Sequence, residues 1–123
     1  MGYRSEVAIK CEEKAFEMLR ETYKRVDLVP NKVYKDEECF ILYWDWIKWY
    51  ENYEDVSAII STMDKLDELQ DLNNYKDTGY GYRFMRLGEN DDDVETREND
   101  WNIELYMIRK IDIPENLEEY KEE

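Results

Sequence analysis

The chain has 123 residues, of which 42% are hydrophobic and 40% charged, and its formal net charge at pH 7 is -15. This length predicts one domain spanning residues 1–123, and the hydrophobic share argues against an intrinsically disordered chain. A negative field of this size disfavours direct contact with nucleic acid or anionic membranes and favours basic partners, although the same charge can serve solubility alone.

Alternating apolar and polar residues predict a first strand over residues 3–10, almost at the N-terminus. A helix is expected over residues 12–25, because apolar side chains recur there at steps of three and four, and the charges of its first and last turns suit the helix dipole. Pro30 cannot continue that helix. Residues 32–34 are then expected to form a short strand, from which a turn without glycine leads into the next segment.

Residues 38–50 are densely hydrophobic and contain three of the four tryptophans. β-branched and aromatic residues at this density favour a strand over a buried helix. Strict alternation places four large side chains on a single face, namely Phe40, Leu42, Trp44 and Trp46. The opposite face is also largely apolar, so we expect this strand to lie inside the sheet rather than at its edge.

The second half of the chain begins with the clearest helix signal. Capping residues at positions 52–55 precede an apolar stripe that runs from Val56 to Leu69. Asparagines and a glycine between residues 73 and 79 end this helix. An alternating strand is expected to follow over residues 80–85.

An acidic segment, residues 88–100, is expected to be the loop of a long hairpin. Alternating apolar residues beyond it predict a returning strand over residues 101–113, which stops before a proline. The charged tail, residues 115–123, is expected to be a frayed turn of helix that docks through Leu117 and Tyr120.

In chain order these elements are strand, helix, strand, strand, helix, strand and strand, which predicts the α+β class. Each helix has one apolar stripe to bury, and both helices can pack on one face of the sheet. The expected arrangement is a ferredoxin-like βαββαβ sheet with an added C-terminal strand. If residues 32–34 are only a loop, the same helices cover a four-stranded mixed sheet.

Two short stretches resemble proteins encoded by bacteriophages and prophages. The sequence Gly-Tyr-Arg-Ser-Glu-Val-Ala at residues 2–8, and Trp-Asp-Trp-Ile-Lys-Trp-Tyr at residues 44–50, are similar to segments of a group of small uncharacterised phage proteins. The resemblance implies a phage or mobile-element origin, and therefore a bacterial host. It implies no activity and no site residues.

The sequence offers little for catalysis. It contains no histidine, the commonest general base and metal ligand, and its two cysteines, Cys11 and Cys39, are expected to be core thiols in a reducing cytoplasm. The acidic loop fails as a calcium site, because counting from Asp91 gives Thr96 and Asn102 where an EF-hand requires glycine and glutamate. We expect no catalytic residue, no metal and no cofactor. No signal peptide or membrane-spanning run is present, so the cytoplasm is the expected location.

The aromatic residues have two further uses to consider. Exposed aromatics on an open sheet face can stack RNA bases, but that mode also needs basic residues, and here the charge has the opposite sign. We therefore expect Trp44, Trp46 and Tyr82 to divide between the core and a surface that meets protein.

These features favour an acidic binding protein. Its carboxylates are expected to occupy a basic surface of a host protein, such as a nucleic-acid-binding protein, and to inhibit it by standing in for phosphates, with binding that weakens steeply with salt. The expected contact residues lie on the second helix, in the acidic loop and in the tail: Asp64, Asp67, Glu68, Asp71, Glu89, Asp91, Asp92, Asp93, Glu118 and Glu119. The alternatives are a homo-oligomer, such as a homodimer, that covers its open sheet face with itself, and a small enzyme that uses carboxylates alone or with magnesium.

Overall fold

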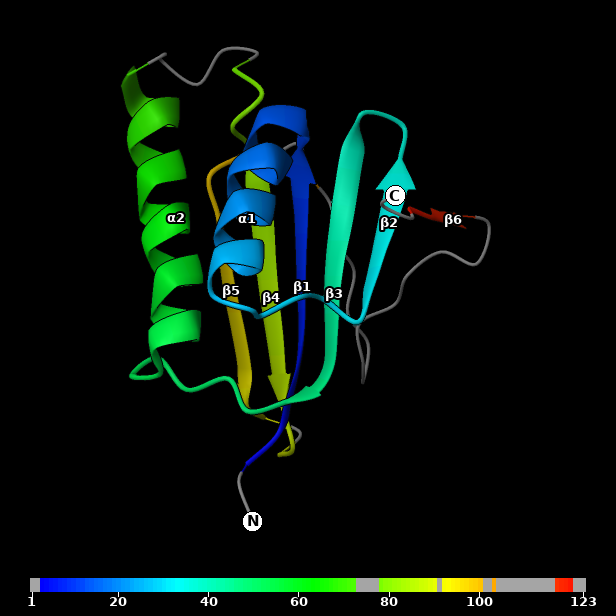
Figure 1. The fold of residues 1–123 in the computed structure, drawn as a ribbon, viewed down its shortest axis with the longest axis vertical. Helices are drawn as coiled ribbons and strands as arrows, with labels where there is room; N and C mark the ends of the chain where they lie inside the picture. The colour runs from blue at the N-terminus through cyan, green and yellow to red at the C-terminus, as the bar shows by residue number, and fades with distance from the viewer. Residues whose placement is uncertain (1–2, 73–77, 91, 101–102, 104–116, 121–123) are drawn as a thin grey trace.

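The computed structural model describes residues 3–72, 78–90, 92–100, 103 and 117–120. The elements in chain order are β1 (Ser5–Glu12), α1 (Glu13–Arg25), β2 (Lys32–Asp36), β3 (Cys39–Ile47), α2 (Glu54–Leu72), β4 (Tyr82–Gly88), β5 (Val94–Glu98) and β6 (Glu118–Glu119). The strands form a six-stranded antiparallel sheet in the order β5-β4-β1-β3-β2-β6. Figure 1 shows α1 and α2 side by side on one face of this sheet. The predicted α+β class is confirmed.

The predicted elements up to β4 are present, with small shifts of their ends. α1 begins directly after β1, and the strand expected at residues 32–34 extends to Asp36, so the alternative of a loop there is wrong. Glu37 completes the glycine-free turn by adopting a φ of +54° itself. β3 lies between β1 and β2, inside the sheet, as its apolar faces predicted.

The segment expected to be an acidic loop, residues 88–100, contains β5 instead. β5 pairs with β4 over all its residues, from Leu87 opposite Val94 to Arg83 opposite Glu98. Its charged residues find partners on neighbouring elements, so the density of charge did not exclude a strand. The sheet therefore extends beyond β4 through β5 and beyond β2 through β6, which differs from the single added C-terminal strand that was predicted.

The tail forms a short strand rather than a frayed helix. β6 pairs with β2, and Tyr120 donates its backbone N–H to the carbonyl of Val33 at 2.5 Å. The docking expected of Leu117 and Tyr120 is confirmed, because each packs against a hydrophobic cluster. The strand expected over residues 101–113 lies outside the described residues, apart from Ile103, which is buried.

The main core lies between the helices and the sheet. Phe16 of α1 stacks on Phe40 of β3 with ring centroids 4.0 Å apart. The hydroxyls of Thr22 and Thr62 form a hydrogen bond of 2.6 Å between the two described helices. The apolar stripes of both helices are therefore buried against one face of the sheet, as predicted.

A smaller cluster lies on the face of the sheet that carries neither described helix. Its four buried residues are each no more than 9% exposed: Ala8, Ile41, Met85 and Leu87. Tyr34, Tyr43 and Leu117 pack against them as partly buried neighbours. This face is therefore not an open apolar surface, and β3 has buried side chains on both sides.

Trp46 does not share a face with Trp44, so the predicted alternation is wrong at this position. The β1–β3 register pairs Ser5 with Ile47 and Val7 with Trp44, which sets two residues of β3 against one of β1. Such a β-bulge shifts the alternation by one residue. Trp46 is 64% exposed, whereas Trp44 is 1% exposed.

The C-terminus of α1 places an aspartate in the left-handed region of backbone conformation. Asp27 has a φ of +57°, and the residue after it, Leu28, donates its N–H to the carbonyl of Tyr23 at 2.9 Å. Helices that end in this way usually have glycine at the left-handed position. Aspartate is also unfavourable there because its charge lies at the negative end of the helix dipole.

We expect Asp27→Gly to raise the free energy of unfolding by about 0.5–1 kcal/mol, because it relieves both the left-handed backbone and the dipole repulsion. Thermal unfolding followed by circular dichroism should show a rise in Tm of roughly 2–5 °C. The control Glu21→Gly, in the exposed middle of α1, should lower stability by about 1 kcal/mol. A loss of stability in Asp27→Gly would contradict this account of the helix end.

Candidate partner-binding surface

α2 carries the first four expected contact residues, spaced along one helical face: Asp64, Asp67, Glu68 and Asp71. One cation from β5 pairs with two of them. The guanidinium of Arg97 donates to Asp64 at 2.6 Å and to Asp67 at 2.7 Å. Glu68 makes an exposed pair with Lys65 at 3.9 Å, and Asp71 is exposed. This face therefore carries less net negative charge than its sequence indicates.

Tyr82 completes the cluster around Arg97 from within the core. Its ring centroid lies 6.0 Å from Cζ of Arg97, and its hydroxyl donates to Asp67 at 2.9 Å. Burial of Tyr82, followed by the nearby charge of Asp67, raises the pKa of its hydroxyl. Burial alone would lower the pKa of Arg97, but its hydrogen bonds to Asp67 and Asp64 outweigh burial and raise that pKa. The cluster joins α2 to β5 and is part of the scaffold.

The turn between β4 and β5 carries the second group of expected contacts, and Arg86 anchors it. The guanidinium of Arg86 donates to Asp93 at 2.8 Å and to Glu95 at 2.9 Å. The hydroxyl of Tyr3 donates to Asp93 at 2.7 Å. The hydrogen bond from Arg86, and then that from Tyr3, lowers the pKa of Asp93. Asp93 therefore holds the turn in place and is not available to a partner in the way that was predicted.

Among the described residues of this turn, Glu89 and Asp92 are the exposed carboxylates. Glu89 accepts a hydrogen bond from the backbone N–H of Arg4 at 3.0 Å. Within the described part of the chain, neither carboxylate belongs to an ion pair. Asp91, which was expected to lie with them, is outside the described residues.

The remaining expected contacts lie in β6. Glu119 is exposed, and the side chain of Glu118 is outside what the structure describes. Figure 1 shows α2, the β4–β5 turn and β6 at three separate places around the sheet. The structure therefore does not bring those of the predicted contact residues that it describes together into one surface.

A second concentration of carboxylates was not predicted. A cleft of about 570 Å³ is lined by Glu12, Glu13, Lys35, Glu37, Glu38, Phe40 and Gly79. Only the pairing of Glu12 with Cys39 brings the two Glu-Glu pairs to the same end of the sheet. No local pattern in the sequence predicts this cleft. Within the described residues, no three acidic or cysteine side chains are grouped closely enough to hold a metal ion.

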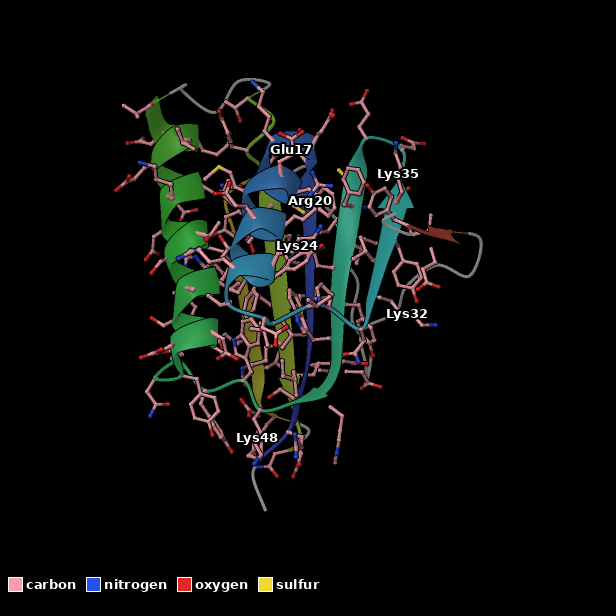
Figure 2. All side chains as sticks on the ribbon, viewed as in Figure 1. Glu17, Arg20, Lys24, Lys32, Lys35 and Lys48 are labelled. Atoms are coloured by element: carbon pink, nitrogen blue, oxygen red, sulfur yellow. The ribbon has the colours of Figure 1, made fainter. Side chains whose placement is uncertain are left out.

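The cations are also unevenly placed. Figure 2 labels Arg20 and Lys24 on α1 and Lys32 and Lys35 on β2, all on the side of the molecule away from the outer face of α2. Arg20 lies 5.2 Å from the ring centroid of Phe16. Glu17, also labelled in Figure 2, and the carboxylates of the cleft lie among these cations, so this side of the molecule is mixed in charge.

The two cysteines are not placed for catalysis. Cys11 is fully buried and Cys39 is half-buried, and both are free thiols. Burial raises the pKa of both, most strongly that of Cys11. Because the thiolate is the nucleophile, a raised pKa lowers the fraction of each cysteine in its reactive form.

Neither described helix combines the length and the apolar character needed to cross a bilayer. Comparisons of the chain with protein families, with curated proteins and with solved structures found no match.

Proposed function

We propose that this chain is an acidic protein-binding module of phage origin. It occupies a basic surface of a host protein in the bacterial cytoplasm and inhibits that protein by placing carboxylates where a nucleic acid places phosphates. The observation that carries the proposal is the negative charge at one end of the sheet, where β3 ends and β4 turns into β5. There Asp45, Glu89 and Asp92 are exposed and belong to no ion pair of the described residues. Negative surface charge that pairs with no cation of the described residues is suited to meet positive charge.

We also propose that the fold is a ferredoxin-like βαββαβ arrangement extended at both edges. The antiparallel order β4-β1-β3-β2, with α1 and α2 on one face, supports this assignment. A homodimer that covers an open sheet face has less support, because Ala8 and Ile41 on that face are already buried in the single chain.

An affinity capture from a bacterial lysate tests the function. The wild type is expected to retain a basic protein at low salt and to release most of it at roughly 0.5 M salt, where the Debye length falls to about 4 Å. The double variant Glu89→Gln/Asp92→Asn should bind the retained protein about three- to tenfold more weakly, as expected for two exposed charges worth ~0.5 kcal/mol each.

The matched control is Glu17→Gln/Glu21→Gln, which removes the same charge from the exposed side of α1. It should bind nearly as well as the wild type. Equal losses in the two variants would show that net charge alone matters and that this end of the sheet has no special part. No basic protein captured at low salt would remove the proposal altogether.

A further inference from the structure

Trp46 is an exposed tryptophan held in a left-handed backbone conformation. In the β1–β3 bulge, Asp45 and Trp46 both stand opposite Glu6. Trp46 has a φ of +56° and is 64% exposed. Bulky residues rarely adopt this conformation, because the Cβ atom approaches the following carbonyl oxygen. The fold therefore loses free energy at this position while most of the side chain stays exposed.

The Trp46 ring has no internal partner that accounts for its position. Within the described residues it makes no aromatic, cation–π or hydrogen-bond contact, whereas the rings of Trp44 and Trp49 lie 5.7 Å apart inside the core. Backbone strain of this kind concentrates at functional positions. Tryptophan is also among the residues most enriched at the centres of protein interfaces. Strain and exposure together indicate a contact surface.

Trp46 lies at one end of a row of residues that crosses the face without described helices. Glu6 pairs with Leu87, and Leu87 pairs with Val94, so these positions share one face with the bulge. Val94, at the other end of the row, is 47% exposed. With strands about 4.8 Å apart, the row is roughly 14 Å long. An exposed apolar residue at each end of the row fits an extended polypeptide segment.

The charges around the row indicate which kind of polypeptide segment would bind there. Asp45 beside the tryptophan is exposed, and Glu89 and Asp92 lie in the turn that precedes Val94. Lys48 also lies at this end (Figure 2), so the surface is acidic without being uniformly so. A guanidinium stacks on an indole face and donates to a neighbouring carboxylate, and an arginine is better suited to this than a lysine.

We propose that Trp46 is the anchor of a binding surface for an arginine-bearing segment of a basic protein. The guanidinium stacks on the indole of Trp46 and donates to Asp45, while the exposed Val94 contacts the aliphatic part of the segment. This inference rests on the proposed function, and it names the surface used and the side chain that the partner presents.

Titration with a short oligoarginine peptide, and with oligolysine of equal length, tests the proposal by calorimetry at about 0.15 M salt, where long-range attraction is screened. Oligoarginine should bind the wild type more tightly than oligolysine does. Trp46→Ala and Trp46→Gly should each weaken oligoarginine binding by about tenfold or more, as expected for an interface hot spot. Trp46→Phe should keep most of the affinity, because an aromatic face remains.

The control is Leu72→Ala, which removes an apolar side chain that is 78% exposed at the far end of α2. Trp46→Gly also relaxes the left-handed backbone, so its Tm should equal or exceed that of the wild type and so show that the fold is intact. Binding by Trp46→Gly as tight as by Leu72→Ala would overturn the anchor while leaving the proposed function standing. A wild type that binds neither peptide would overturn the proposed function and this inference with it.

Discussion

Trp44→Ala is expected to lower the free energy of unfolding by about 3–5 kcal/mol, the usual cost of removing a large buried aromatic side chain. Trp44 is 1% exposed, and its ring centroid lies 5.7 Å from that of Trp49. Its Nε1 donates to the carbonyl of Leu28 at 3.0 Å, which ties the segment after α1 to β3. Domains of this size are stable by only about 5–15 kcal/mol, so this variant is expected to be partly unfolded at moderate temperature.

Urea unfolding followed by far-ultraviolet circular dichroism measures the loss. Trp44→Phe separates the contribution of ring packing from that of the hydrogen bond. It keeps a ring in the core but leaves the Leu28 carbonyl without its donor, which should cost about 1–2 kcal/mol. Trp46→Ala is the matched control, two residues along the same strand, and should change stability by no more than roughly 0.5 kcal/mol. Similar losses in Trp44→Ala and Trp46→Ala would contradict the bulge that separates their environments.

The contrast between these two tryptophans shows what the sequence can predict. Dense aromatic and β-branched residues were enough to predict β3 and its place inside the sheet, because both of its faces are apolar. The bulge is a property of two strands together: β1 supplies one residue where β3 supplies two. Nothing in the Trp-Asp-Trp sequence itself reveals that mismatch, so strict alternation assigned Trp46 to the wrong face.

For a related reason, the sequence could not show which of the expected contact residues are engaged within the chain. Charge density along the sequence correctly found the exposed Glu89 and Asp92, but it treated every carboxylate nearby as available. Asp64 and Asp93 are engaged by Arg97 and Arg86, which come from other strands. The sequence analysis assigned no role to either cation, because their contacts depend on the β4–β5 pairing. Availability of a carboxylate depends on contacts between elements, and these are not visible in a single sequence.

Arg86→Ala is expected to lower the free energy of unfolding at pH 7 by about 2 kcal/mol, because it leaves carboxylates without their donor in a partly buried place. The Arg86 side chain is 16% exposed and donates to Asp93, Glu95 and the hydroxyl of Ser5. The acids themselves are 33% and 42% exposed, so solvent screening keeps the cost below that of a fully buried pair.

The loss of stability in Arg86→Ala should depend on pH, and the lowered pKa of Asp93 sets the direction of that dependence. Hydrogen bonds from Arg86 and then Tyr3 lower the pKa of Asp93 in the folded chain. A carboxyl group with a lowered pKa stabilises the fold above its unfolded pKa of about 3.9, and that contribution disappears as the pH falls through the folded pKa. The stability difference between wild type and Arg86→Ala should therefore shrink as the pH is lowered from 7 to about 3.

Lys65→Ala is the control for this prediction. Its pair with Glu68 is 3.9 Å long and exposed on both sides, so its removal should cost no more than about 0.3 kcal/mol at any pH. A loss in Arg86→Ala that stays constant with pH would show that packing of the arginine, rather than its bond to Asp93, holds the turn. If the bond does hold it, Arg86→Ala also releases the segment that presents Glu89 and Asp92, and it should weaken partner binding although Arg86 itself touches no partner.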